Sequence, residues 1–185
     1  MTLTFWILLS AAALLPIWAL FVFNRLVRLR NQMRNAWADI DVQLARRHDL
    51  VPQLVAAVKG YASHEQAVLS AVTELRAAAM AQSSPARLYP IESELEQALT
   101  RIFALKEAYP DLKASENFIK LQSALVEVED HLQYARRFYN GAVRDHNDAV
   151  QRVPDLVVAR MFGFHDGEFY QPGADARQSP KVTMQ

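Results

Sequence analysis

The chain opens with an apolar run that is long enough to cross a membrane. Within residues 3–23 the exceptions to apolar character are Thr4, Ser10 and Pro16, and the run contains no charged residue. At about 1.5 Å per residue, a helix of this length just spans a hydrocarbon core of about 30 Å. Backbone polar groups in lipid must be satisfied internally, which leaves a helix as the expected conformation. We therefore predict that residues 1–23 form a transmembrane anchor.

A cleaved signal peptide is the alternative interpretation of this run. A signal peptide needs a basic n-region, a short apolar core and a small-residue cleavage site. Here no basic residue precedes the run, and Ala11, Ala12 and Ala13 come too early, with more apolar sequence behind them. These features favour an uncleaved anchor.

The charges behind the apolar run predict its orientation. Four arginines follow it, and the first acidic residue is Asp39. By the positive-inside rule, the N-terminus lies outside and the body lies in the cytoplasm, at a bacterial inner (plasma) membrane. The opposite orientation stays open, because arginines also bind anionic headgroups. The membrane-proximal basic residues are Arg25, Arg28, Arg30 and Arg34.

Behind the anchor, apolar residues recur three and four positions apart, which is typical of helices that pack along one face, as in a coiled coil. No segment alternates in the manner of a strand. The pattern predicts an all-α protein: an N-terminal transmembrane helix and an antiparallel up-and-down four-helix bundle with two long and two short helices. Turn residues divide the pattern, and the helices are expected at residues 24–59, 64–82, 90–108 and 115–152.

Several positions inside this pattern need interpretation. Pro52 predicts a kink in the first helix or a restart at Asp49. Gly60 can end that helix in a left-handed conformation, yet the heptad phase continues through it, so the first two helices could instead be one bent rod. Ser115 can cap the fourth helix. Arg47 occupies a position where the heptad pattern expects an apolar residue.

The sequence after the fourth helix changes character twice. We assign residues 24–155 to the bundle, 156–170 to a short apolar segment near the membrane and 171–185 to a flexible tail. In an antiparallel bundle the fourth helix returns towards the bilayer, so the apolar segment either covers the base of the bundle or rests in the headgroup region. Its apolar residues are Leu156, Val157, Val158, Met161, Phe162 and Phe164.

Composition narrows the possible functions. The formal net charge is zero, which gives no indication of a nucleic-acid partner. The chain has no cysteine, which excludes disulfides, zinc–thiolate sites and thiol nucleophiles. No Gly-rich phosphate loop and no nucleophile elbow occurs. We therefore expect a protein that is not an enzyme, with no cofactor and no evident small-molecule substrate.

Several strings resemble the LemA family of bacterial membrane proteins. The longest is NAWADIDVQLARRHDLVPQL at residues 35–54, which continues as VKGYASHE at 58–65. YPDLKA at 109–114, ARRFYN at 135–140 and Phe162-Gly163-Phe164 agree with it. The resemblance implies an N-terminal transmembrane helix and a helical-bundle body, without established catalytic residues. It also implies an association of relatives with membrane proteolysis systems and magnetosome membranes.

The polar residues near the turns have two interpretations. His48 and Asp49 form either a polar contact site or a helix cap with its partner. His146 occupies a core-facing position, where Arg34 or Asp39 could satisfy it and fix the register. The possible partner-contact residues are His48, Asp49, Tyr61, His64, Glu65 and Tyr109.

The preferred function is a membrane-anchored scaffold or adaptor that binds the lipid bilayer and either a protein partner or a second copy of itself. One alternative is a metal-dependent or enzymatic module that uses His48 and His64, although no zinc-binding spacing occurs. Another is a membrane-remodelling protein that uses the arginines and the segment 162–164.

Overall fold

A computed structural model describes the backbone of residues 3–170 and the side chains of residues 13–170. The tail expected at 171–185, and the side chains in the first half of the expected anchor, lie outside this part of the chain. The contacts divide the chain into two compact units. Unit 1 comprises Met1–Ala38 and Phe138–Gly167, and unit 2 comprises Asp39–Arg137 and Glu168–Gln185. Each unit is described separately below.

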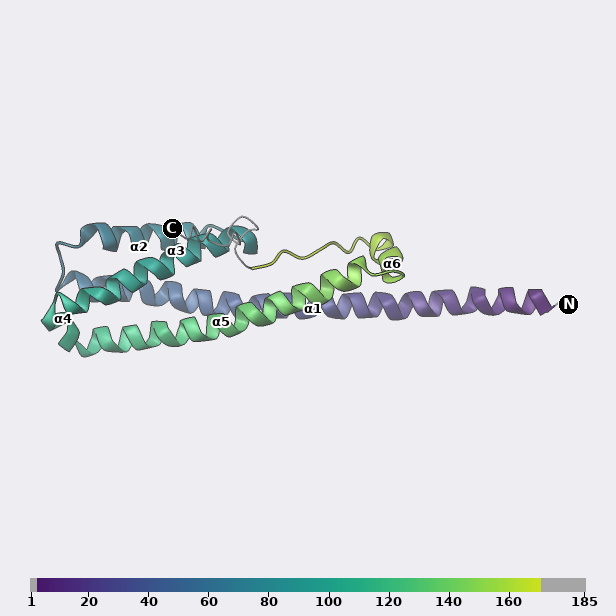
Figure 1. Ribbon diagram of the computed structural model, residues 1–185, viewed down its shortest axis with the longest axis horizontal. Helices are drawn as coiled ribbons and strands as arrows, with labels where there is room; N and C mark the ends of the chain where they lie inside the picture. The colour runs from purple at the N-terminus through teal and green to yellow at the C-terminus, as the bar shows by residue number, and fades with distance from the viewer. Residues whose placement is uncertain (1–2, 171–185) are drawn as a thin grey trace, which may run out of the picture. The chain divides into compact units, whose positions relative to one another are not determined.

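The all-α prediction is confirmed, because the described residues contain helices and no strand. Two helices, α1 (Leu3–Lys59) and α5 (Glu116–Gln151), are much longer than the others (Figure 1). Each of them contributes to both units, and the shorter helices belong to a single unit. Helices α2 (Gln66–Met80), α3 (Pro85–Ala104) and α4 (Pro110–Ala114) belong to unit 2, and α6 (Asp155–Met161) belongs to unit 1. The 3-10 turn η1 (Leu105–Glu107) lies between α3 and α4 in the chain.

Unit 2 is the four-helix bundle expected from the heptads. Residue 76 of α2 contacts residue 48 of α1, so α2 runs back beside α1 rather than extending it. Phe103 and Phe118 lie 6.4 Å apart between ring centroids, which brings α5 back beside α3. The single bent rod is therefore wrong. Helices α1, α2, α3 and α5 share one core with Leu112 of α4, formed by Val51, Leu54, Val58, Leu69, Val72, Leu95, Leu99, Ile102, Phe118, Leu121 and Leu125.

The helix boundaries differ from the prediction at two prolines, which lie inside helices rather than at their ends. Helix α1 continues through Asp49 and Pro52 to Lys59, so the expected restart at Asp49 does not occur. Helix α3 begins at Pro85 rather than at the expected residue 90, and it contains Pro90. Proline is favoured in the first turn because its missing N–H would have had no partner there. The cap expected at Ser115 is confirmed, since its Oγ accepts the Phe118 N–H at 3.4 Å.

Unit 1 is built from the N-terminal part of α1, the C-terminal part of α5, helix α6 and the segment that follows it. Phe23 stacks edge-on against Phe162 and Phe164, with ring centroids 4.9 and 5.8 Å away. The left-handed glycine of the described residues is Gly163, with φ 67°, rather than Gly60. The apolar core consists of Val22, Leu26, Ala149, Val150, Val158, Ala159 and Phe164.

A membrane-spanning helix is not found among the residues whose side chains are described, 13–170. The expected anchor begins before this range. The backbone of residues 3–23 is helical, and the same helix continues into residues 24–59, as the sequence predicts.

Candidate functional site

Charged side chains are buried in the core of unit 2, between α1 and α3. Arg47 Nη1 donates to Glu92 Oε2 at 3.0 Å, and His48 Nε2 lies 2.7 Å from Glu92 Oε1. The Glu92 side chain is 0% exposed and that of Arg47 is 2% exposed. Arg47 also pairs through Nη2 with Glu129 of α5, so three helices meet at one guanidinium. We refer to Arg47, His48, Glu92, Glu129 and Arg136 as the charge cluster.

The electrostatics of the charge cluster keep its central carboxylate ionised. Burial alone would raise the pKa of Glu92, because it removes water from the charged form. The hydrogen bond with His48 and the charge of Arg47 outweigh burial and lower the pKa of Glu92 below its usual value. The side chain is therefore a buried anion with a partner on each carboxylate oxygen. Removing Glu92 or one of its two partners should destabilise the bundle, since an unpaired buried charge is costly.

The charge cluster extends to the end of the described chain through Arg136. Arg136 Nη1 lies 3.5 Å from Glu129 Oε1, and its guanidinium stacks 5.4 Å from the Tyr170 ring centroid and 5.9 Å from that of Tyr89. Burial raises the pKa of Tyr170 to about 12, because little water reaches its phenol. Residues 168–170 are thus fixed against the bundle of unit 2.

Pro52 creates an acceptor beside the charge cluster. An α-helix bonds each N–H to the carbonyl four residues earlier, and proline has no N–H. The carbonyl of His48 consequently lacks its helical donor, and Arg76 Nε of α2 donates to it at 2.6 Å. The proline that suggested a helix break instead supplies a contact that positions α2 beside α1.

Part of this site can be expected from the sequence. Arg47 is a charged residue in an apolar position, and its burial requires an acid on a neighbouring helix. Glu92 and Glu129 were not identified. Glu92 lies in the buried stripe of α3, four residues after Leu88 and three before Leu95, so it too is a charged residue in an apolar position. Glu129 lies beside the stripe of α5. Only the packing of α3 and α5 against α1 brings them to Arg47. His48 was identified, but its partner is Glu92, and Asp49 is an exposed mid-helix residue rather than a cap.

The remaining predicted contact residues gather at the connection between α1 and α2. Tyr109 donates its hydroxyl to Glu65 Oε1 at 3.2 Å, which brings these two together. Tyr61 is 45% exposed and His64 is also exposed. His48 lies elsewhere, inside the charge cluster. Burial, followed by the neighbouring Glu65 carboxylate, raises the pKa of Tyr109.

The metal-site alternative finds no support in the described residues, where no group of three or more histidine, aspartate or glutamate side chains is placed to hold a metal ion. His48 is bound to Glu92, and His64 lies exposed between α1 and α2. Every oxygen of the Glu92 carboxylate is already used by the charge cluster.

A groove of 220 Å³ lies between α3 and α5 and ends on the charge cluster. Arg47 and Glu129 line it at that point, and Glu96 and Asp130 add two more carboxylates. Its other lining residues are Leu99, Thr100, Phe103, Leu125 and Val126. We refer to this feature as the acidic groove, because it combines apolar walls with three carboxylates and one paired arginine.

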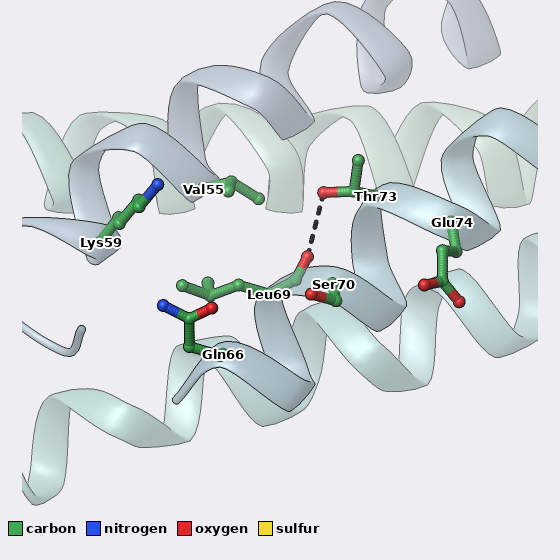
Figure 2. Close-up of a pocket in the computed structure, with 7 residues that line it drawn as sticks. All are labelled: Val55, Lys59, Gln66, Leu69, Ser70, Thr73 and Glu74. Atoms are coloured by element: carbon green, nitrogen blue, oxygen red, sulfur yellow. Dashed lines mark hydrogen bonds between the residues drawn. The ribbon is translucent and has the colours of Figure 1, made fainter. Parts of the chain in front are cut away.

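A second groove, of 290 Å³, lies between α1 and α2 (Figure 2). Val55 and Leu69 provide its apolar surface, and Lys59 and Glu74 lie on its two sides. The Thr73 hydroxyl donates to the Leu69 carbonyl at 3.0 Å and is thereby used within α2. These residues do not converge on a common point.

The polar contacts of unit 1 attach the segment after α6 to α5. His146 is 1% exposed and its Nε2 lies 3.0 Å from the carbonyl oxygen of His165, so its partner is neither Arg34 nor Asp39 as expected. Asn147 accepts from the Gly167 N–H at 2.7 Å and donates to the Gly167 carbonyl at 3.1 Å.

The arginines behind the apolar run fall into two groups. Arg25 Nη1 pairs with Asp155 at 2.8 Å, and Arg30 stacks 5.0 Å from the Phe164 ring centroid, so both bind the segment that follows α5. Arg28 and Arg34 are exposed. Arg28 lines an open groove of 480 Å³ with Asn24, Val27, Asn31, Gln32, Asn35 and Phe138.

The chain is similar in sequence to known proteins. Residues 36–184 match the model of the LemA family. Magnetosome protein MamQ 2 of Paramagnetospirillum magneticum is 24% identical, over 88% of this chain and 69% of that protein. Protein LemA of Metamycoplasma hominis is 26% identical, over 80% of this chain and 68% of its own length. Magnetosome protein MamQ of Magnetospirillum gryphiswaldense is 22% identical, over 88% of this chain. Because the family match covers most of the chain, the protein belongs to the LemA family.

Proposed function

We propose that this chain is a membrane-anchored, non-catalytic scaffold or adaptor whose helical bundle binds a protein partner. The observation that carries the proposal is the charge cluster, whose buried acids and bases are bound to one another. A general acid or base needs a proton-accepting or proton-donating group directed at a substrate. In the charge cluster, Glu92 binds Arg47 and His48 instead.

The anchor in this proposal is the apolar run of residues 3–23, supported by its length and lack of charge. The arginines behind it favour an N-terminus outside and a bundle in the cytoplasm of a bacterial inner membrane. Two of the curated relatives are named magnetosome proteins, which is consistent with a role at a membrane-bounded structure.

The acidic groove is the surface best suited to a partner. Its apolar walls fit the apolar face of an amphipathic helix, and Glu96 and Asp130 complement basic residues on that helix. The exposed end that carries Tyr61 and His64 is a second possible contact surface.

Photo-crosslinking in intact membranes tests this function. A photoreactive residue replaces Thr100 in the acidic groove, Tyr61 at the exposed end, or Ala77 on α2 as a control that lines neither surface. We expect a discrete protein adduct from Thr100 that disappears in the Glu96→Gln/Asp130→Asn background. An adduct from Tyr61 alone would move the contact to the other surface, and no adduct from either position would contradict the scaffold.

Orientation is tested with single-cysteine variants, since the chain has no cysteine of its own. A membrane-impermeant maleimide should label Ala77→Cys in lysed cells but not in intact spheroplasts. Labelling in intact spheroplasts would place the bundle on the outer face.

A further inference from the structure

Helix α6 has one buried and one exposed apolar face. Its inner face packs Val158 and Ala159 into the core of unit 1 beside Val22 and Leu26 of α1. On its outer face Val157 and Met161 are 63 and 67% exposed, and Val153 just before the helix and Phe162 just after it are 75 and 54% exposed. Val157 and Met161 are four residues apart within α6, which places them on one side of the helix. We refer to these four residues as the outer stripe of α6.

The position of α6 along α1 coincides with the end of the apolar run. Phe162 stacks on Phe23, the last residue of that run, and Asp155 pairs with Arg25 just behind it. In the proposed anchor, this is the level at which hydrocarbon gives way to headgroups. The exposed apolar residues Leu20 and Phe21 of α1 lie at the same level of the helix.

The charges around the outer stripe suit an anionic surface. Arg152 directly precedes Val153 in sequence, Arg160 directly precedes Met161, and both arginines are exposed. Arg28 of α1, five residues after Phe23, is also exposed. Asp155, the acidic residue of α6, is 8% exposed and paired with Arg25, so it does not oppose an anionic partner. Arginines beside an apolar stripe are typical of helices that lie in the headgroup region of anionic bilayers.

From these observations we infer that the outer stripe of α6 inserts into the headgroup–acyl boundary of an anionic bilayer, as a second membrane contact beside the anchor. The inference rests on the proposed anchoring by residues 3–23. The molecule that contacts the outer stripe is then lipid rather than a protein partner. The energetic gain is the burial of the four apolar side chains, supported by Arg152 and Arg160 on phosphate groups.

The test uses the full chain in vesicles of zwitterionic lipid with and without phosphatidylglycerol. A nitroxide is attached to Val157→Cys or Met161→Cys, and to Val126→Cys as a control, 51% exposed but in unit 2. Collision with oxygen, which partitions into lipid, is compared with collision with a water-soluble nickel complex. We expect oxygen to dominate at residues 157 and 161 in anionic vesicles, and nickel to dominate at residue 126.

The outcomes separate this inference from the proposed anchoring. Carbonate extraction first reports whether the chain is integrated in the vesicles, and release would contradict the anchor itself. If the chain is integrated but nickel dominates at residues 157 and 161, the membrane contact of α6 is wrong. If neither reagent reaches them, protein covers the stripe, and spin–spin broadening between labelled copies would identify a second copy. A result independent of phosphatidylglycerol would overturn the role of the arginines.

Discussion

In unit 2 the buried ionisable side chains bind one another, whereas in unit 1 the buried histidine and aspartate bind a backbone carbonyl and a partly exposed arginine. In unit 2, Arg47 and His48 share the Glu92 carboxylate. In unit 1, buried His146 binds a backbone carbonyl, and Asp155 binds an arginine that is 44% exposed. Unit 2 is therefore stabilised by ion pairs between helices that are far apart in sequence. Unit 1 is stabilised by contacts with α6 and the segment that follows it.

The two units also differ in net charge and in exposed apolar residues. The residues of unit 1 carry seven arginines and four aspartates, and those of unit 2 carry a compensating acidic excess, so a formal net charge of zero conceals a separation. Unit 1 also exposes the apolar outer stripe of α6. Unit 1 therefore combines a basic excess with exposed apolar side chains, whereas unit 2 carries the acidic excess.

The largest effect is expected from Glu92→Gln. This change leaves Arg47 buried without its carboxylate on α3, and breaking a buried pair costs about 3–5 kcal/mol. Hydrogen exchange followed by mass spectrometry should show the loss of protection in peptides of unit 2 and little change in unit 1.

Glu127→Gln is the matched control for Glu92→Gln. Its partner is Arg46, at 3.2 Å, and both side chains are about half exposed, so the cost should lie within about 1 kcal/mol. Equal losses in the two variants would show that burial of the charge cluster contributes nothing.

The next effect concerns the contact at Pro52. Arg76→Leu removes the donor to the His48 carbonyl, and the loss of a charged hydrogen bond costs about 1.5–3 kcal/mol. In the Pro52→Ala background the helix regains its own N–H for that carbonyl, so the same change should cost less. A double-mutant cycle on the unfolding of unit 2 measures this coupling, and additive costs would refute it.

Unit 1 is tested at Gly167. A Cβ there would lie 2.4 Å from Met33 Sδ, but this atom is near the end of a flexible side chain that can move aside, so Gly167→Ala should cost no more than about 1 kcal/mol. Gly141→Ala is the control, because nothing lies within 4 Å of its Cβ. It should stabilise α5 by up to about 1 kcal/mol. Tryptophan emission reports the result in unit 1, which contains all three tryptophans.

The smallest effect is the dependence on pH. Burial raises the pKa of Glu92 and its partners His48 and Arg47 lower it, so the two contributions partly cancel and the net lowering of the pKa is reduced. A lowered folded pKa contributes stability that is present above the unfolded pKa and is lost as pH falls through the folded pKa. The unfolding free energy of unit 2 should therefore fall on acidification below about pH 4.5, and less steeply in Glu92→Gln. Identical slopes would contradict this assignment.

Much of the fold follows from periodicity, because the apolar stripes predict the helices and their antiparallel order. The charge cluster does not follow from it in full. Arg47 was recognisable as an exception within its own stripe, but its partners depend on how three helices align. In unit 1, the partner of His146 could not be anticipated, since it is a backbone carbonyl in an irregular segment.

Pro52 has one further consequence, for the alignment of α2 with α1. Two apolar helix faces can slide past each other by one turn, about 5.4 Å, and still bury similar surface. Such a slip would carry Arg76 away from the His48 carbonyl and leave both unpaired. A residue that weakens an isolated helix thus makes one alignment of the pair more favourable than its neighbours.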